Sequence, residues 1–135
     1  MSCFEWTVRV YYEDTDSGGV VYHSNYLNFM ERARTEWLRS LGFEQDELIS
    51  NQQCIFAVHS MQLKFRRPAK FNDLLLIQSC ITNVSGASFE FEQKIMRDNE
   101  LLCEAVVKIA CLNSTRFRPM SIPTFIQDAI SKHAD

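Results

Sequence analysis

The segment from Tyr11 to Tyr26 brings together residue types that acyl transfer requires. It holds a carboxylate, Asp16, followed by Gly18 and Gly19, which free the backbone to turn sharply or to approach a ligand closely. A few residues later the hydrophobic pattern predicts the start of a helix. The first N–H groups of a helix are unpaired and lie at the positive end of its dipole. A base or nucleophile beside an oxyanion-binding helix N-terminus suits attack on an acyl carbon.

The neighbouring polar residues leave alternatives open. Taken alone, Asp16 is as well suited to forming a turn as to catalysis, whereas Asp14 is expected to shape the loop through backbone hydrogen bonds. The side chain of His23 could donate to a substrate, relay a proton or help to cap the helix. Tyr22 and Tyr26 are expected mainly to pack, with a hydrogen-bonded hydroxyl at the tip.

Two elements must position this segment. Residues 4–12 alternate with period two, which predicts a strand. From Ser24 to Leu41 the apolar residues recur at steps of three and four, which predicts a long helix with a broad apolar face. Ser24 or Asn25 is the expected N-cap, and Gly42 stands where a C′ glycine belongs.

The rest of the chain reads mainly as strands separated by short turns. Residues 44–50 can add a helical turn or two, and a short helix is expected after Pro123. Four strands are expected over residues 55–65, 73–84, 88–97 and 101–113. Short turns force antiparallel pairing, so we expect one α+β domain over residues 1–135: a five-stranded antiparallel sheet wrapped around one long central helix, which is the hotdog fold. Its open edges need protection, which favours at least a dimer.

Composition excludes several classes of protein. The net charge of −3 and the pI near 5.6 argue against nucleic acid as the main partner. The N-terminus lacks a basic region followed by an apolar stretch, and the aliphatic run Leu74–Ile77 is too short for a transmembrane segment. We therefore expect a soluble cytoplasmic protein. The sequence also contains no glycine-rich phosphate loop of the P-loop or Rossmann kind.

The five cysteines form no CxxC pair, and their number is odd. This predicts neither a metal site nor a disulfide framework; the cysteines are expected to be small buried hydrophobic residues in a reducing compartment. His59 and His133 belong to no motif. On the predicted helix, Glu31 is expected to pair with Arg34, and Arg32 with Glu36.

The motif residues resemble a known family. Residues 14–26 resemble the signature of the 4-hydroxybenzoyl-CoA thioesterase family of hotdog proteins, and residues 9–16, 19–23 and 31–36 resemble its YbgC branch, which is associated with the bacterial Tol-Pal system. The resemblance implies a cofactor-independent acyl-CoA thioester hydrolase. It also implies a homodimer or a homotetramer built as a dimer of dimers, and it leaves acyl-carrier protein open as an alternative carrier of the acyl group.

By this resemblance, Asp16 is the catalytic carboxylate, which either attacks the thioester carbonyl or activates a water molecule, and the backbone N–H of His23 holds the thioester oxygen. Further substrate contacts are expected from Gly19, Val20, Val21, Tyr22, Tyr26, Arg66 and Arg67. The two arginines belong to a basic cluster with Lys64 and Lys70 that could hold the phosphates of coenzyme A, as could Arg116 and Arg118, although a solvated charged face is the alternative.

The depth of an acyl pocket, and with it the acyl preference, depends on which of six residues line it, and the sequence does not decide that: Phe29, Met30, Phe56, Val58, Met61 and Phe65. Two other functions compete with hydrolysis. One is a different hotdog enzyme such as a dehydratase, and the other is a non-enzymatic protein that binds acyl thioesters or acyl-carrier protein or serves as an envelope adaptor. Loss of function in Asp16→Asn would distinguish hydrolysis from simple binding.

Overall fold

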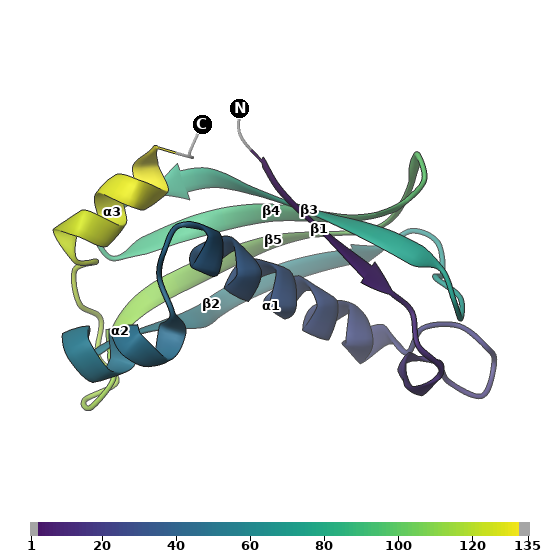
Figure 1. Ribbon diagram of the computed structural model, residues 1–135, viewed down its shortest axis with the longest axis horizontal. Helices are drawn as coiled ribbons and strands as arrows, with labels where there is room; N and C mark the ends of the chain where they lie inside the picture. Colours follow the sequence, from purple (N-terminus) through teal and green to yellow (C-terminus); the bar gives the residue numbers. More distant parts are fainter. Residues whose placement is uncertain (1–2, 133–135) are drawn as a thin grey trace.

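The computed structural model describes residues 3–132, so His133 lies outside the described residues. Five strands and three α-helices follow one another along the chain (Figure 1). In chain order they are β1 (Cys3–Arg9), α1 (His23–Ser40), α2 (Gln45–Gln52), β2 (Cys54–Phe65), β3 (Leu74–Val84), β4 (Ser88–Arg97), β5 (Glu100–Asn113) and α3 (Thr124–Ser131). A short 3-10 turn, Tyr12–Asp14, lies between β1 and α1.

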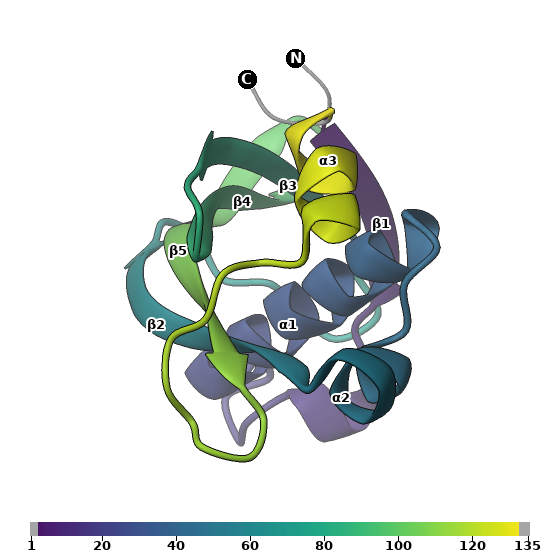
Figure 2. The same ribbon diagram turned by 90° about the vertical axis from the view of Figure 1, so that its left-hand side faces the viewer.

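All five strands form one antiparallel sheet in the order β1-β3-β4-β5-β2. Viewed end-on, the sheet curls around α1, with β1 on one side of the helix and β2 on the other (Figure 2). Three consecutive strands, β3 to β5, pair as neighbours because their connections are too short for anything but antiparallel pairing. The predicted α+β hotdog architecture is confirmed.

The core lies between α1 and the concave face of the sheet. Along β4 the alternate residues Phe89, Phe91, Gln93 and Ile95 are buried, as the period-two pattern predicts. The helix buries Tyr26, Phe29, Met30, Ala33, Trp37 and Leu38, which lie at helical spacing. Trp37 packs edge-on against Phe91, with ring centroids 4.9 Å apart, so large aromatic side chains join helix to sheet.

The predicted N-cap of α1 is wrong. Helix α1 begins at His23 with Tyr22 as N-cap and no capping side chain, so neither Ser24 nor Asn25 is the cap. Backbone pairing replaces side-chain capping here, because the N–H of Asn25 donates to the carbonyl of Tyr22 at 2.8 Å. At the other end Gly42 has φ +95° and follows the C-cap Leu41, as predicted.

A buried polar network fastens α1 to the sheet. Gln93 is fully buried, and its Nε2 donates to the carbonyl of Met30 at 3.0 Å and to Oγ of Ser79 at 2.9 Å. Its Oε1 accepts from the guanidinium of Arg34 at 2.8 Å. The predicted pair of Arg32 with Glu36 is wrong, because Glu36 pairs with Arg39. Arg34 bonds to Gln93, and Glu31 acts on it through its charge and forms no ion pair with it among the described residues.

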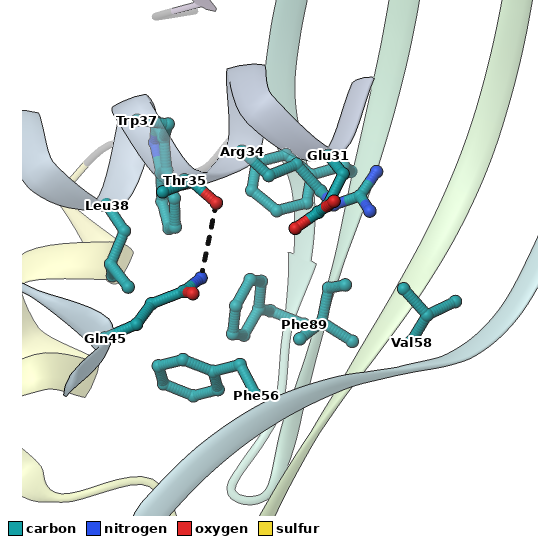
Figure 3. Close-up of a pocket in the computed structure, with 11 residues that line it drawn as sticks. Glu31, Arg34, Thr35, Trp37, Leu38, Gln45, Phe56, Val58 and Phe89 are labelled. Atoms are coloured by element: carbon teal, nitrogen blue, oxygen red, sulfur yellow. Dashed lines mark hydrogen bonds between the residues drawn. The ribbon is translucent and has the colours of Figure 1, made fainter. Parts of the chain in front are cut away.

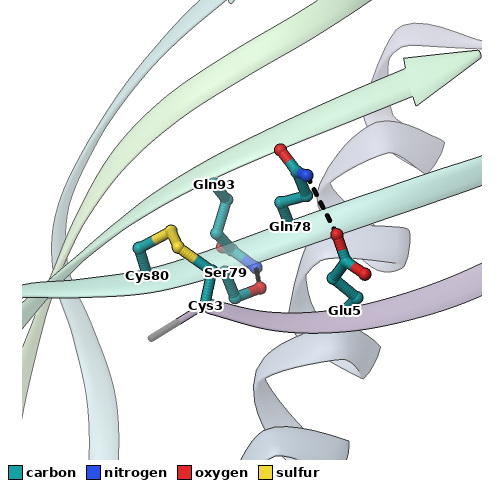
Figure 4. The surroundings of a disulfide bond; sticks show 6 residues. All are labelled: Cys3, Glu5, Gln78, Ser79, Cys80 and Gln93. Atoms are coloured by element: carbon teal, nitrogen blue, oxygen red, sulfur yellow. Dashed lines mark hydrogen bonds between the residues drawn. A yellow bond between two sulfur atoms is a disulfide. The ribbon is translucent and has the colours of Figure 1, made fainter. Parts of the chain in front are cut away.

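The cysteine prediction is partly wrong. Cys3 and Cys80, which are 77 positions apart in the sequence, form a disulfide across β1 and β3 (Figure 4). They lie directly opposite in the register of the two strands, and spacing along the chain gives no sign of that. Cys54, Cys103 and Cys111 are free and buried, as expected. Burial raises the pKa of the Cys103 thiol to about 12, which keeps it protonated and unreactive.

Candidate active site

The segment between β1 and α1 folds into a tight loop that returns to its own start. Thr15 and Val21 form a β-bridge, and the N–H of Asp16 donates to the carbonyl of Val20 at 2.9 Å. The N–H of Gly19 donates to the carbonyl of Asp16 at 3.1 Å, and Gly19 has φ +81°, a backbone conformation that favours glycine. These backbone bonds give the loop a fixed shape and connect Asp16 to the residues just before α1.

The carboxylate of Asp16 is held by its own loop. Its Oδ1 accepts the N–H of Gly18 at 2.8 Å, and the residue is exposed to solvent. A Cβ at position 18 would lie 3.2 Å from that oxygen, so glycine gives the carboxylate the room it needs. Among the described residues no hydrogen bond to Oδ2 is found, which leaves that oxygen available to water or substrate.

Asp14 has the loop-forming role predicted for it. Its Oδ2 accepts the N–H of Tyr11 at 2.8 Å, which closes the 3-10 turn and ends β1 at Arg9 instead of residue 12. Its carbonyl accepts from the N–H of Tyr22 at 3.0 Å and from Nδ2 of Asn25 at 2.9 Å. Asp14 therefore ties the loop to the first turn of α1, and its carboxylate is already occupied.

The N-terminus of α1 presents unbonded donors next to this loop. The N–H groups of Val21, Tyr22 and Asn25 all donate to backbone carbonyls. For His23 and Ser24, no backbone acceptor is found in the part of the chain that the structure describes. Two adjacent free N–H groups at the positive end of an 18-residue helix can stabilise a developing oxyanion.

The aromatic residues of the motif separate into exposed and buried ones. Tyr22 and His23 are exposed, and their rings lie against each other with centroids 4.4 Å apart. Tyr26 is buried and its hydroxyl accepts the N–H of Ala69 at 2.9 Å, so the prediction of packing with a hydrogen-bonded tip is confirmed for this residue. Burial raises the pKa of its hydroxyl, which therefore stays protonated.

The segment before β3 supports the loop from the side. Val20 forms a β-bridge with Lys70, and the N–H of Val21 donates to the carbonyl of Ala69 at 2.9 Å. This segment is itself anchored, because Asp73 pairs with Arg97 at 2.8 Å. Burial alone would raise the pKa of Asp73, but the N–H of Lys70 and the guanidinium of Arg97 outweigh it and lower that pKa.

Two of the four residues in the predicted basic cluster form ion pairs. Arg66 pairs with Glu104 at 3.1 Å and Arg67 with Glu100 at 3.0 Å. These acids lie on β5, and only the pairing of β2 with β5 brings them beside the two arginines. Exposed pairs of this kind exchange partners at low energetic cost, so a phosphate could still compete for the guanidinium groups.

A cavity of about 220 Å³ lies between α1 and the sheet, near the start of α2 (Figure 3). Aromatic and aliphatic side chains form much of its wall, including Trp37, Leu38, Phe56, Val58, Phe89, Phe91 and Ile109. Glu31, Arg34, Thr35 and Gln45 supply its polar wall. Burial lowers the pKa of Arg34, and the charge of Glu31 opposes that shift.

Of the six residues considered as the lining of an acyl pocket, Phe56 and Val58 line this cavity. Phe29 and Met30 are instead buried in the core. The sequence did not predict that Arg34 lines the cavity or that Gln93 holds it there through a hydrogen bond. The one sign of this in the sequence is a glutamine at an inward-facing position of β4. Phe65 contacts Tyr26, with ring centroids 5.4 Å apart, and thus lies nearer to the loop.

Within residues 3–132, no group of three or more histidine, cysteine or acidic side chains is arranged to hold a metal ion. No helix in the same range is long and apolar enough to cross a bilayer.

Comparisons with known proteins agree with this geometry. The model of the thioesterase-like superfamily matches residues 10–130. The chain is 45% identical over 126 residues to a Haemophilus influenzae protein named acyl-CoA thioesterase YbgC, and the match covers 93% of each chain. A Bartonella henselae protein named probable thioesterase is 39% identical; its crystal structure superposes with a TM-score of 0.86 and covers 90% of this chain and 100% of its own. The Synechocystis 1,4-dihydroxy-2-naphthoyl-CoA thioesterase Slr0204 is 27% identical, with a TM-score of 0.88 and 96% coverage of both chains.

Proposed function

This chain belongs to the thioesterase-like superfamily, and from that premise we propose that it hydrolyses acyl-CoA thioesters to a free acid and CoA. One observation carries the proposal. The carboxylate of Asp16 accepts the N–H of Gly18 in a loop whose backbone bonds to Tyr22, the residue directly before the unbonded N–H groups of His23 and Ser24. A fixed carboxylate beside paired oxyanion donors is the arrangement that acyl transfer to water requires.

In the proposed reaction the thioester oxygen accepts from the N–H of His23, which polarises the carbonyl carbon. Asp16 then takes a proton from water while the water oxygen forms a bond to that carbon, or the carboxylate itself attacks to form an anhydride that water later cleaves. Collapse of the tetrahedral intermediate breaks the C–S bond and releases CoA as a thiolate, which takes up a proton. Single turnover in ¹⁸O-labelled water separates the two routes, because only the anhydride route can leave label in Asp16.

We place the acyl group along α1, with its far end in the cavity lined by Phe56 and Phe89. Glu31 follows His23 by eight residues, which is about 12 Å along the helix axis. The apolar wall favours aliphatic or aromatic acyl groups over charged ones. Hydrolysis of a panel of short, long and aromatic acyl-CoAs would rank these groups.

A second copy of the chain completes the proposed enzyme. Strand β2 is 12 residues long and forms one edge of the sheet, with β5 as its neighbour on one side only. Val58 and Phe65 on this strand are 49% and 53% exposed, although they contribute to the cavity wall and to the contact with Tyr26. Pairing of β2 with β2 of a second copy would satisfy the open edge and cover these side chains. Sedimentation distinguishes this dimer from a dimer of dimers.

We also propose the cytoplasm as the site of action, because acyl-CoA is available there, and a role alongside the Tol-Pal system by resemblance to the YbgC branch. Acyl-carrier protein is the alternative carrier. Parallel assays with one acyl group on CoA and on acyl-carrier protein decide between the two carriers by kcat/KM. Co-purification with Tol-Pal components from cells tests the proposed setting.

The decisive experiment compares free thiol release by the wild type, Asp16→Asn and Asp14→Asn. Replacing the catalytic carboxylate is expected to lower kcat by roughly 10²–10⁴-fold. The Asp14 variant is the matched control, because an amide oxygen can still accept the N–H of Tyr11, and kcat should fall by less than about tenfold. Equal activity of the wild type and Asp16→Asn, with both proteins folded, would remove Asp16 from the mechanism.

A further inference from the structure

Two large aromatic side chains stand exposed beside the catalytic loop. Tyr12 is 80% exposed and Phe71 is 53% exposed, and their rings meet edge-on with centroids 5.9 Å apart. Neither ring belongs to the hydrophobic core or packs against it. The fold therefore gains little from this pair, and exposed aromatic surface of this kind is a common feature of binding sites.

The backbone on both sides of this pair is rigidly held. Tyr12 begins the 3-10 turn, and its carbonyl accepts from the N–H of Thr15 at 3.1 Å and from the Thr15 hydroxyl at 2.7 Å. Phe71 precedes Asn72, whose φ of +73° turns the chain and whose N–H donates to the carbonyl of Val10 at 3.0 Å. Both rings are thus presented from fixed positions, which lowers the entropic cost of binding.

Two basic residues stand close in the chain to the two rings. The guanidinium of Arg9 donates to the carbonyl of Asn72 at 2.7 Å, and Lys70 is the residue next to Phe71. No ion pair of Arg9 or of the Lys70 ammonium is found within residues 3–132, whereas Arg66 and Arg67 are both paired with glutamates. Uncommitted cations are the better phosphate ligands, because binding breaks no existing ion pair.

The nearby carboxylates leave these cations available. Asp73 is neutralised by Arg97, and Asp14 accepts the N–H of Tyr11. Glu13 is exposed next to Tyr12 and would repel a phosphate there. This charge distribution places an anionic group toward Lys70 and Arg9, and a neutral flat group over the rings.

The corner formed by Arg9, Tyr12, Lys70 and Phe71 adjoins the proposed catalytic loop through the β-bridge between Val20 and Lys70. Resting on the proposed thioesterase function, we propose that this aromatic corner binds the nucleotide end of coenzyme A. The adenine stacks on the face of Tyr12, the more exposed ring, and meets Phe71, whose ring is nearly perpendicular to that of Tyr12, along one edge; the phosphates bind Lys70 and Arg9. The corner, not the Arg66–Arg67 cluster, is then the main anchor of the carrier.

The test uses two substrates with the same acyl group, acyl-CoA and acyl-pantetheine, because the second lacks the nucleotide. In the double variant Tyr12→Ala/Phe71→Ala, KM for acyl-CoA is expected to rise roughly tenfold or more, and in Lys70→Ala somewhat less. KM for acyl-pantetheine should stay within about twofold of the wild type, since that substrate makes no contact with the corner. Phe117→Ala and Lys108→Ala are matched controls, because Phe117 is 67% exposed but lies in the turn after β5, and Lys108 is an exposed strand residue.

Unchanged KM for acyl-CoA in the corner variants would overturn the proposal. An equal rise for both substrates would also overturn it, because the corner would then act only through the shape of the loop. Calorimetric binding of 3′-phospho-ADP gives an answer independent of catalysis: weaker binding to the corner variants supports the proposal even if no acyl-CoA is turned over, and equal binding refutes it. Failure of the wild type to hydrolyse either substrate would instead count against the proposed function.

Discussion

The two edges of the sheet are built in opposite ways. Strand β1 is seven residues long, carries Glu5, Thr7 and Arg9 on its exposed face, and is bonded covalently to β3 through Cys3–Cys80. Strand β2 is 12 residues long, has an irregularity between Val58 and Ser60, and exposes apolar side chains. A short charged strand discourages pairing with another chain, whereas a long apolar one favours it.

The contrast explains where the functional parts lie. The loop that carries Asp16, the proposed catalytic residue, follows directly after β1, and the cavity between α1 and the sheet reaches Phe56 and Val58 at the β2 edge. In the proposed enzyme, one edge holds the reacting groups in place and the other binds the second copy. Substitutions at each edge should affect different properties, and this separation can be tested.

The largest expected effect on stability is at the β1 edge, where the disulfide joins β1 to β3. Cys80→Ser removes a cross-link between residues 77 positions apart and should lower the free energy of unfolding by about 2–4 kcal/mol, with a Tm lower by roughly 10 °C. Thermal melts with and without dithiothreitol measure it, because reduction should reproduce the effect in the wild type and leave Cys80→Ser unchanged. Identical melts for the wild type and Cys80→Ser, each with and without dithiothreitol, would mean that the disulfide does not form in solution. Thiol labelling in cell extracts shows whether a reducing cytoplasm keeps this bond open.

The second effect concerns the open edge. Val58→Lys introduces a charge where the second copy is expected to bind, and should weaken dimerisation by roughly 100-fold. Analytical ultracentrifugation over a range of concentrations measures it. Leu74→Lys is the matched control, since Leu74 is 52% exposed but lies on β3 opposite Arg9 of β1, away from the β2 edge. Equal loss of dimer in both variants, or in neither, would show that β2 is not the interface.

The third effect lies between the edges, at the polar network under α1. Gln93→Leu removes the partner of Arg34, Ser79 and the Met30 carbonyl, and should cost about 2 kcal/mol of stability because their buried polar groups lose a bond. Urea unfolding measures the change. The oligomeric state should be unaffected, since neither edge is altered; dissociation would show that the helix position and the β2 edge are coupled.

The smallest effect is a pH dependence of stability at Asp73, in the segment that supports the Asp16 loop. The pKa of Asp73 is lowered in the folded protein, so its contribution to stability is full above its ordinary pKa and is lost as the pH falls through the folded value. Arg97→Gln removes one cause of that shift and should reduce the loss of stability between pH 5 and 2 by less than about 1 kcal/mol. Unfolding curves across this pH range check it; a larger loss in the variant would reverse the sign of the argument.

Local patterns predicted the elements well. Strand β4, Ser88–Arg97, has the predicted bounds, and α1 begins and ends one residue before its predicted limits. Both follow from side-chain periodicity, which neighbouring residues determine. The cap of α1 and the end of β1 were predicted wrongly, because the N–H of Asn25 bonds to the carbonyl of Tyr22 and the carboxylate of Asp14 accepts the N–H of Tyr11. Such bonds depend on how the loop closes, and hydrophobic spacing carries no information about that.

The sequence by itself determined the reactive segment: a carboxylate at Asp16, glycines at 18 and 19, and a helix start immediately afterwards, all within one short stretch of chain. Only the tertiary structure decided the long-range partners. The register of β1 against β3 brings Cys3 to Cys80, and the position of α1 on β4 brings Arg34 to Gln93, 59 residues away. A register reflects the packing of whole strands and helices, so no single pair of residues encodes it.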